Sequence, residues 1–408
     1  MKNRRKKAKE LLQAAHRVSS YRRDIIDPKQ FSVLKALVKE IEVLLNDKQI
    51  DHAVFDPMLD RLDELLRKVG GKIYPKTFLS DNIEVILVAA IIVIGIRSFF
   101  FQPFIIPTNS MYPTYSGMNS IVYNEETSPS RLSRILNKLT LGTRHYRVIA
   151  NYSGEIELLV AQTSEGGLVA YYEVVNGRKW FGIMPARLKE YTFLVDQKPH
   201  TLRIPLEFSL EETLENSLLK NLNPKNIRNI GNGLFAVSFG QQANKGDVLL
   251  EFAIMSGDAL FVDRLSYHFV KPSVGDPFVF RTNDILDSVG RATGDYTPKY
   301  YIKRIGGIEY EEIEIINGSL HVNKTPRTEV EAFLSNSKQV GEYTGYINER
   351  LLAKGRSMIV PENNYVALGD NSANSADSRY WGFVPDQAVI GKAVFIYYPF
   401  TKRWGLAN

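Results

Sequence analysis

The chain has 408 residues, of which 44% are hydrophobic and 24% charged, a balance typical of folded proteins. It has no cysteine, which excludes disulfide bonds, thiolate catalysis and cysteine-ligated zinc or iron–sulfur sites. No two of its 6 histidines lie within ten residues of each other. The short-spaced metal-binding motifs are therefore missing, and we expect no metal and no other cofactor.

The formal net charge of +6 is concentrated at the N-terminus. Residues 1–80 carry a formal charge of +7, and the other 328 residues carry −1. The cluster KNRRKKAK at residues 2–9 could bind RNA. Because it precedes an apolar segment, we favour a topological role, in which positive charge keeps the N-terminus in the cytoplasm. We therefore expect no nucleic-acid partner.

Residues 1–80 have the pattern of amphipathic helices. Asp27-Pro28 and Asp56-Pro57 punctuate two apolar stripes, and Gly70 follows the second. We predict that the stripes pack together as a small helical hairpin in a cytoplasmic region, with binding of a partner or a membrane surface as the alternative. The stripes consist of Leu34, Leu37, Val38, Ile41, Leu44 and Leu45, and of Leu59, Leu62, Leu66 and Val69.

An apolar segment follows at residues 83–101. Its uncharged part has 12 residues, fewer than the roughly 20 of a spanning helix, and its β-branched residues would also suit a buried strand. Glu84 and Arg97 lie near its ends, where charged side chains can reach lipid headgroups. We predict a single transmembrane helix at residues 81–101, with the N-terminus cytoplasmic and the remaining chain on the exported side.

Beyond residue 101 the pattern changes to alternating or short apolar runs separated by Gly, Asn and Asp turns. Examples are YYIKRIGGIEY, EEIEIINGSLHVN, NNYVALGD and KAVFIYYP. Such runs are typical of strands joined by tight turns. We therefore predict a mainly β domain with antiparallel sheets.

Ser110 lies in FIIPTNSMYPT, residues 104–114, between Pro107 and Pro113. The prolines indicate a turn, so the serine is either a turn residue or a nucleophile. Without a histidine motif, the base that activates it would be a lysine whose burial lowers its pKa. Lys303 in YYIKRIGG has apolar neighbours, but alternation places Lys303 and Arg304 on opposite faces without saying which faces inward. A solvated Lys303 is the alternative.

Four segments carry a resemblance to a known family. They are RSFFFQPFIIPTNSMYPT, SGDALFVDRLSYHFVKPSVGDPFVFR, YYIKRIGG and GDNSANSADSRYWGFVPDQAVIGKAVFIYYP. In this order they resemble bacterial type I signal peptidase, a membrane-bound serine endopeptidase of the Ser/Lys class that removes signal peptides from exported preproteins. The resemblance implies that Ser110 is the nucleophile and Lys303 the general base. It also implies an oxyanion hole formed by Thr108 and the backbone N–H of Ser110.

The same resemblance implies roles for further residues. Ser375 would position the lysine amine by hydrogen bonding, and Asp377 with Arg379 would form a structural ion pair behind the site. Shallow apolar pockets would bind the small side chains at positions −1 and −3 of the preprotein. The residues implied to line them are Phe104, Ile106 and Ile302.

The chain departs from the family's pattern in three places. GDNSANS stands where GDNRDNS is usual, so Ser372 and Ala373 replace a charged pair, and the usual glycine-proline-glycine-aspartate turn after Lys303 is absent. The third departure is an insertion of 139 residues, 116–254, directly after the nucleophile segment. We expect a catalytic β domain at 102–115 and 255–408, interrupted by a β-rich subdomain of unknown role.

The resemblance implies a monomeric enzyme of the bacterial inner membrane, with its catalytic domain on the periplasmic side and the lipid bilayer as a partner. Two alternatives remain. One is a specialised relative that processes a restricted substrate, such as a pilin or secretion-system subunit. The other is an inactive, membrane-anchored binding protein that acts through residues 116–254. Retention of both Ser110 and Lys303 favours the enzyme.

Overall fold

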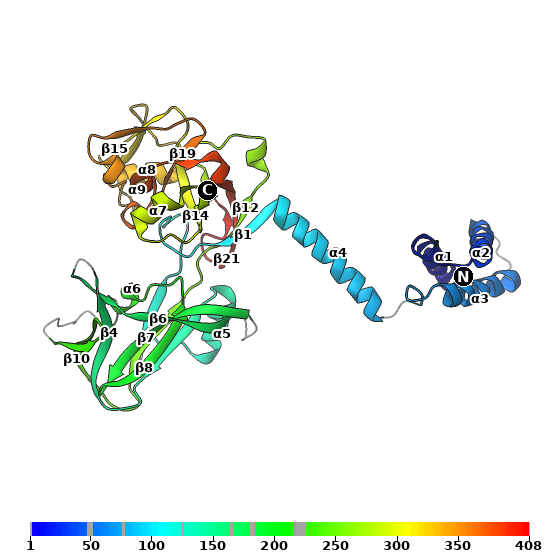
Figure 1. Cartoon of the computed structure of the whole chain (residues 1–408), viewed down its shortest axis with the longest axis horizontal. Helices are drawn as coiled ribbons and strands as arrows, with labels where there is room; N and C mark the ends of the chain where they lie inside the picture. The colour runs from blue at the N-terminus through cyan, green and yellow to red at the C-terminus, as the bar shows by residue number, and fades with distance from the viewer. Residues whose placement is uncertain are drawn as a thin grey trace. The chain divides into compact units, whose positions relative to one another are not determined.

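The computed structural model describes residues 2–46, 52–75, 78–124, 126–163, 166–179, 184–215, 217 and 226–407. The chain forms two compact units, Met1–Gly95 and Ile96–Asn408. Figure 1 shows the chain coloured by residue number, with many of the helices and strands labelled.

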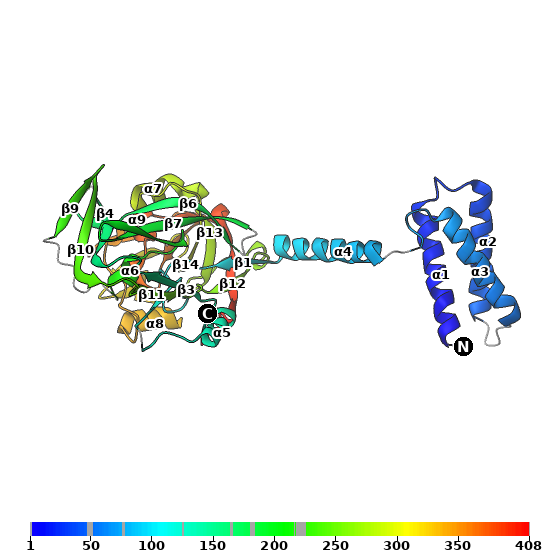
Figure 2. The ribbon, with the colours of Figure 1, turned by 90° about the horizontal axis from the view of Figure 1, so that it is seen from below.

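The first unit contains a bundle of three helices, α1 (Lys2–Tyr21), α2 (Pro28–Asn46) and α3 (His52–Val69). Both predicted apolar stripes lie in its core, and Figure 2 shows the helices side by side. The predicted hairpin was therefore incomplete. The third face comes from α1, whose apolar positions are partly alanines in a Lys- and Arg-rich sequence and so give a weak periodic signal. These positions are Ala8, Leu11, Leu12, Ala15 and Val18.

Helix α3 begins earlier than Asp56-Pro57 suggests. Pro57 lies inside the helix, as its sixth residue. A proline at this position removes one backbone hydrogen-bond donor near the start of the helix. Packing of the buried leucines of α3 compensates for the missing hydrogen bond. The helix ends at Val69, before Gly70, as predicted.

Helix α4 (Phe78–Phe99) covers most of the predicted membrane segment. Among the described residues it is the one helix long and apolar enough to cross a membrane, and no residue of its stretch Asn82–Phe99 is buried in the protein. After α4 the chain passes directly into strand β1, Phe101–Ile105.

The largest sheet of the second unit has the order β1-β12-β21-β13-β14-β19-β20, with β22 added on β21. Every pairing in it is antiparallel. Its other strands are β12 (Ala259–Asp263), β13 (Pro277–Arg281), β14 (Tyr300–Gly307), β19 (Asn364–Leu368), β20 (Val384–Pro385), β21 (Val389–Tyr398) and β22 (Gly405–Leu406).

A smaller sheet and short helices complete this part. The sheet has the order β17-β16-β15-β18, and it shares one apolar core with α8 and with Val366 and Leu368 of β19. Its strands are β15 (Glu312–Ile316), β16 (Ser319–Val322), β17 (Thr325–Pro326) and β18 (Ser357–Ile359), and the helices are α7 (Leu286–Thr293), α8 (Glu331–Lys338) and α9 (Ser378–Trp381).

Residues 116–254 contain two further antiparallel sheets, of order β2-β11-β3 and β6-β7-β4-β10-β9, with β5 paired to β4 and β8 to β7. One apolar core lies within them; its buried members all fall between Val148 and Ile254, and Met118, Val122 and Tyr146 pack against it. The strands are β2 (Ser120–Tyr123), β3 (Arg144–Ile149), β4 (Gly154–Gln162), β5 (Leu168–Ala170), β6 (Tyr172–Lys179), β7 (Met184–Val195), β8 (Lys198–Pro205), β9 (Ile227–Gly231), β10 (Leu234–Ala243) and β11 (Val248–Ile254), with helices α5 (Arg131–Thr140) and α6 (Glu211–Glu215).

The chain leaves for these sheets and returns from them at one place. The Asp258 amide donates to the Ser116 carbonyl at 2.8 Å, and the Met255 amide donates to the Asn119 carbonyl at 2.8 Å. Because the two ends of residues 116–254 are hydrogen-bonded to each other, the strands before and after this segment stay close together. The segment can therefore form a core of its own without disturbing them. The predicted fold class, mainly antiparallel β with N-terminal helices, is confirmed.

Candidate active site

Ser110 lies in a turn a few residues after β1. The Tyr112 amide donates to the Asn109 carbonyl at 3.1 Å, which closes the turn around the serine. The Ser110 side chain is buried. The turn predicted from Pro107 and Pro113 is therefore present, and it directs Ser110 into the protein.

Lys303 lies in the middle of β14, between β13 and β19. Its side chain is only 4% exposed, and its Nζ lies 2.5 Å from Ser110 Oγ. The alternative of a solvated lysine is thus wrong. Burial lowers the pKa of Lys303 from its ordinary 10.5 to about 8, with the carboxylate of Asp377 opposing the shift and the guanidinium of Arg379 adding to it.

Arg304, the neighbour of Lys303, is also buried, on the opposite face of β14. Its guanidinium forms a bidentate ion pair with Asp370 at 2.8 and 2.7 Å, and Thr114 Oγ1 donates to the same carboxylate at 2.6 Å. The sequence reasoning missed this pair. Because β14 is covered on both faces, both cations of the Lys-Arg sequence had to be buried, and the aspartate of GDN was the available counter-ion.

A second buried ion pair lies behind the lysine, as the resemblance implied. Arg379 Nε donates to Asp377 Oδ1 at 2.8 Å, and both side chains are fully buried. Ser375 Oγ donates to Asp377 Oδ2 at 2.8 Å. The hydroxyl that was expected to position the lysine amine therefore has its hydrogen bond to the aspartate, and its action on the lysine stays a prediction.

Gly369 and Asn371 hold the GDN segment against the nucleophile turn. The Asn371 amide donates to the Ser110 carbonyl at 3.1 Å, and its side chain donates to the Asn109 carbonyl at 3.1 Å. A Cβ on Gly369 would lie 2.5 Å from the Ser110 carbonyl oxygen and still closer to Ser375 Oγ. Only glycine permits this approach of the two segments.

Three predicted pocket residues lie in one apolar cluster. Ile106 and Ile302 are buried members of it, and Phe104 packs against it from β1. Phe104 also contacts Tyr300 edge to face, with 5.3 Å between ring centroids. The sheet thus brings together residues almost 200 positions apart.

Thr108 is exposed, two residues before the nucleophile. The backbone of Thr108 packs directly against Gly117, where a Cβ would lie 2.5 Å from the Thr108 carbonyl oxygen. The Gly117 amide donates to Asn109 Oδ1 at 2.8 Å. The backbone that carries Thr108 and Ser110 is therefore braced by the first residues after the turn.

The departures in the GDNSANS segment have structural replacements. Ser372 is buried, its Oγ accepts from the Ile347 amide at 2.8 Å, and its carbonyl accepts from Arg379 Nη2 at 2.7 Å. The turn after β14 closes through Glu311, whose carboxylate accepts from the Ile308 amide at 2.9 Å. Other hydrogen bonds thus occupy both places, and two of them involve a charged group, the guanidinium of Arg379 and the carboxylate of Glu311.

Asp258 of the SGD sequence is a further residue that the sequence reasoning did not single out. It is fully buried, accepts from the Ser116 amide at 2.7 Å, and accepts from Arg403 Nε at 2.8 Å. It joins the end of the nucleophile segment to the C-terminal residues. An aspartate in an otherwise apolar run, SGDALFV, was the signal for a buried ion pair.

Comparison with known proteins identifies the family to which the chain belongs. The family model described as "Signal peptidase, peptidase S26" matches residues 79–150 and 250–398, more than half of the chain. The chain belongs to this family. The match covers the nucleophile turn, β14 and the GDN segment, and leaves 151–249 unmatched.

Similar members of the family come from cyanobacteria and plants. The chain is 34% identical over 149 residues to "Probable signal peptidase I-1" of Synechocystis sp., covering 36% of this chain and 66% of the relative. It is 33% identical over 146 residues to "Probable thylakoidal processing peptidase 2, chloroplastic" of Arabidopsis thaliana, covering 36% and 35%. The chain thus spans less than two thirds of the length of these relatives.

A crystal structure of a signal peptidase I from Enterococcus faecalis V583 is also similar. The sequence identity is 27%, with 30% of this chain and 97% of that chain covered and a TM-score of 0.23.

Replacing Gly369 with alanine tests the contact between the GDN segment and the nucleophile turn. The added methyl collides with the Ser110 carbonyl and displaces Ser110 from Lys303, so we expect kcat/KM for a peptide substrate to fall by about 100-fold or more. Ala373→Ser, at an exposed position of the same segment, is the matched control. Unchanged kinetics in Gly369→Ala would show that the contact does not hold the nucleophile.

The pKa of Lys303 gives the site a pH dependence. A general base must be neutral, so kcat/KM should rise about tenfold per pH unit below a pKa of about 8 and level off above it. The measurement is a pH profile on a peptide substrate, with circular dichroism at each pH as a control for unfolding. A profile that falls through this range would exclude the lysine as base.

Proposed function

We propose that this protein is a membrane-bound serine endopeptidase that removes N-terminal signal peptides from exported preproteins. The observation that carries the proposal is the 2.5 Å contact between Ser110 Oγ and the buried Nζ of Lys303. An amine whose pKa is about 8 is neutral in about a tenth of molecules at pH 7, far more than an ordinary lysine, and a base for a serine hydroxyl must be neutral.

The first step follows from this geometry. Neutral Lys303 takes the proton from Ser110 Oγ while the oxygen attacks the carbonyl carbon of the scissile peptide bond. Negative charge then develops on the carbonyl oxygen. The Ser110 amide and the Thr108 hydroxyl are the donors that we assign to it, each worth ~3 to 4 kcal/mol in comparable acyl-transfer enzymes.

The second half returns the proton. The Lys303 ammonium donates to the nitrogen of the leaving mature protein as the C–N bond breaks, leaving the signal peptide as an ester on Ser110. Water, deprotonated by Lys303, then hydrolyses the ester and restores the serine. The buried pairs Arg304–Asp370 and Arg379–Asp377 keep the surroundings of the amine nearly balanced in charge, so its protonated state is not strongly stabilised.

The apolar cluster around Ile106, Ile302 and Phe104 supports recognition of small side chains at positions −1 and −3. Ile106 and Ile302 are at least 90% buried, which leaves shallow apolar surface rather than a deep pocket. Such a surface accepts alanine-sized groups and excludes larger ones by overlap.

Helix α4 supports a place in the membrane, since the side chains of Asn82–Phe99 lie on the outside of the protein. The proposal includes a single span, a cytoplasmic N-terminus, a periplasmic catalytic domain at 102–115 and 255–408 with 116–254 inserted, and action as a monomer. The separate core at 148–254 and the paired ends at Ser116 and Asp258 support the insertion.

Removal of either dyad residue tests the activity. Ser110→Ala and Lys303→Met should each lower cleavage of a purified preprotein in detergent on the order of 10⁴- to 10⁶-fold, as loss of the nucleophile or base does in other serine proteases. Lys299→Met removes an exposed lysine just before β14 and should cleave at the parent rate. Processing at a normal rate by either dyad variant would rule out this mechanism.

Accessibility in cells tests the topology. A protease added to spheroplasts should digest residues after 101 and spare residues 1–80, because only the former lie outside the membrane in this proposal. Fragments are identified by antibodies to tags at the two ends of the chain. Digestion of the N-terminal region alone would reverse the orientation.

A further inference from the structure

Helix α5 exposes an apolar face that the protein leaves uncovered. Its four large apolar residues recur at spacings of three and four, so they lie on one side of the helix. All are more than half exposed, although such side chains usually face a core. They are Leu132 at 68%, Ile135 at 57%, Leu136 at 53% and Leu139 at 66%.

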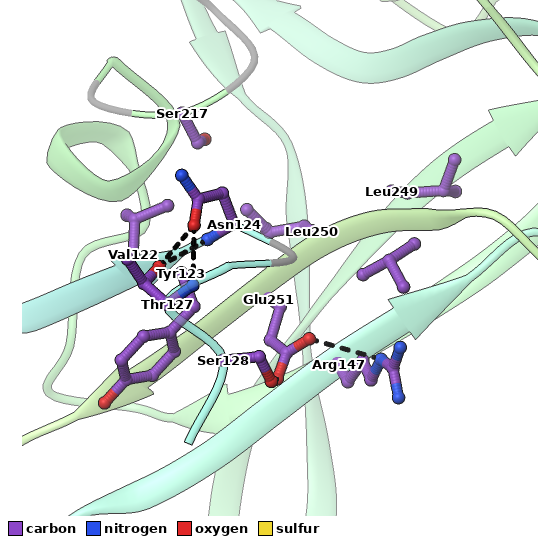
Figure 3. A pocket seen from close by; sticks show the side chains of 11 residues that line it. Val122, Tyr123, Asn124, Thr127, Ser128, Arg147, Ser217, Leu249, Leu250 and Glu251 are labelled. Atoms are coloured by element: carbon purple, nitrogen blue, oxygen red, sulfur yellow. Dashed lines mark hydrogen bonds and ion pairs between the residues drawn. The ribbon is translucent and has the colours of Figure 1, made fainter. Parts of the chain in front are cut away.

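The opposite side of α5 is fixed to the protein by Arg134. This side chain lies 3.0 Å from Glu251 Oε1 of β11 and donates to the Pro129 carbonyl at 2.9 Å and to Ser128 Oγ at 3.2 Å. Figure 3 shows Glu251 beside Ser128 and Arg147 in the wall of a cavity of about 820 Å³. The attachment fixes the rotation of α5, and its apolar face points away from the protein.

The C-terminal end of α5 is attached to the catalytic sheet. Tyr398 Oη donates to the Lys138 carbonyl at 3.1 Å, and the Phe400 amide donates to the Thr140 carbonyl at 3.0 Å. Tyr398 pairs with Ala259 of β12, which in turn pairs with Ile105 of β1. Strand β21, to which α5 is attached, is therefore only two strand spacings, roughly 10 Å, from β1, the strand that follows the membrane segment.

Exposed aromatic residues adjoin this end of α5. Phe400 is 59% and Trp404 51% exposed, and their ring centroids lie 6.4 Å apart. Aromatic side chains of this kind are enriched where proteins meet the headgroup region of a bilayer. They continue the uncovered apolar surface of α5 toward the sheet.

The charged residues of α5 itself are all basic. They are Arg131, Arg134 and Lys138, and Arg134 is already paired with Glu251 of β11. Arg131 and Lys138 are exposed and flank the apolar face on one edge. A short helix with an apolar face and only basic charges is typical of segments that lie in the surface of an anionic membrane.

We propose that α5 is a membrane-surface helix. Its apolar face, with Phe400 and Trp404, enters the outer surface of an anionic bilayer, and Arg131 and Lys138 contact lipid phosphates. The inference rests on the proposed membrane placement of α4, and it adds a second contact, about 30 residues after the span, that sets the height of the catalytic sheet above the lipid.

Single cysteines test the proposal directly, because the natural chain has none. Full-length Leu136→Cys, Asn137→Cys and Val88→Cys proteins are labelled with an environment-sensitive fluorophore and reconstituted into vesicles of phosphatidylglycerol and phosphatidylcholine in equal parts. Leu136 lies on the apolar face of α5, Asn137 on the opposite side, and Val88 in α4. Lipids that carry a nitroxide on the acyl chain serve as quenchers.

We expect blue-shifted emission and strong quenching at positions 136 and 88, and neither at 137. Leu139→Glu in the Leu136→Cys background should remove the blue shift and the quenching at position 136, and the same substitution should leave the quenching at position 88 unchanged. Vesicles made of phosphatidylcholine without phosphatidylglycerol should weaken the quenching at position 136. Quenching at 88 without quenching at 136 would overturn the inference and leave the membrane anchor intact. Blue-shifted emission at position 136 without quenching by the nitroxide lipids would overturn the inference, because a protein partner or a second copy would then cover the face.

The readout does not depend on catalysis, so Ser110→Ala should give the same fluorescence. Absence of quenching at 88 would instead contradict the proposed span, and would remove the basis of the inference with it. Failure of the proposed peptidase activity and failure of the membrane-surface helix are therefore distinguishable.

Discussion

The hydrogen bond between Lys303 and Ser110 is the interaction on which the rest of the site depends. It requires an amine that is buried and yet without a permanent counter-ion of its own. The structure achieves this by placing a paired cation and carboxylate on each side of the lysine: Arg304 with Asp370, and Arg379 with Asp377. Because each guanidinium neutralises its partner, desolvation outweighs attraction, and the pKa of the lysine falls.

A serine turn and a lysine strand can meet only if a third segment holds them, and residues 369–379 have that role. Gly369 permits backbone contact with Ser110, while Asp377 collects hydrogen bonds from Ser375, Arg379 and the Gly369 amide. Asp258 acts similarly at the other end of the nucleophile segment. Since 116–254 leaves and returns at this same point, an inserted subdomain with its own core is compatible with an undistorted dyad.

Two exposed apolar features, α4 and the outer face of α5, have no packing explanation within the described protein. Burial of either in lipid would remove apolar surface from water at sites joined through β1, β12 and β21. In the proposed arrangement, the two contacts hold the catalytic sheet next to the membrane surface.

The sequence was sufficient to predict most of the elements: two amphipathic helices, the apolar segment and the alternating strands. Through four ordered segments it also identified Ser110 and Lys303 as the dyad candidates. Those features are local, because periodicity and short motifs depend on neighbouring residues. Four features required the folded chain: Lys303 faces Ser110, Arg304 is buried with Asp370, α1 completes a three-helix bundle, and α5 has an uncovered face. Each of these depends on which distant segments fill the space around a side chain, and no local pattern records that.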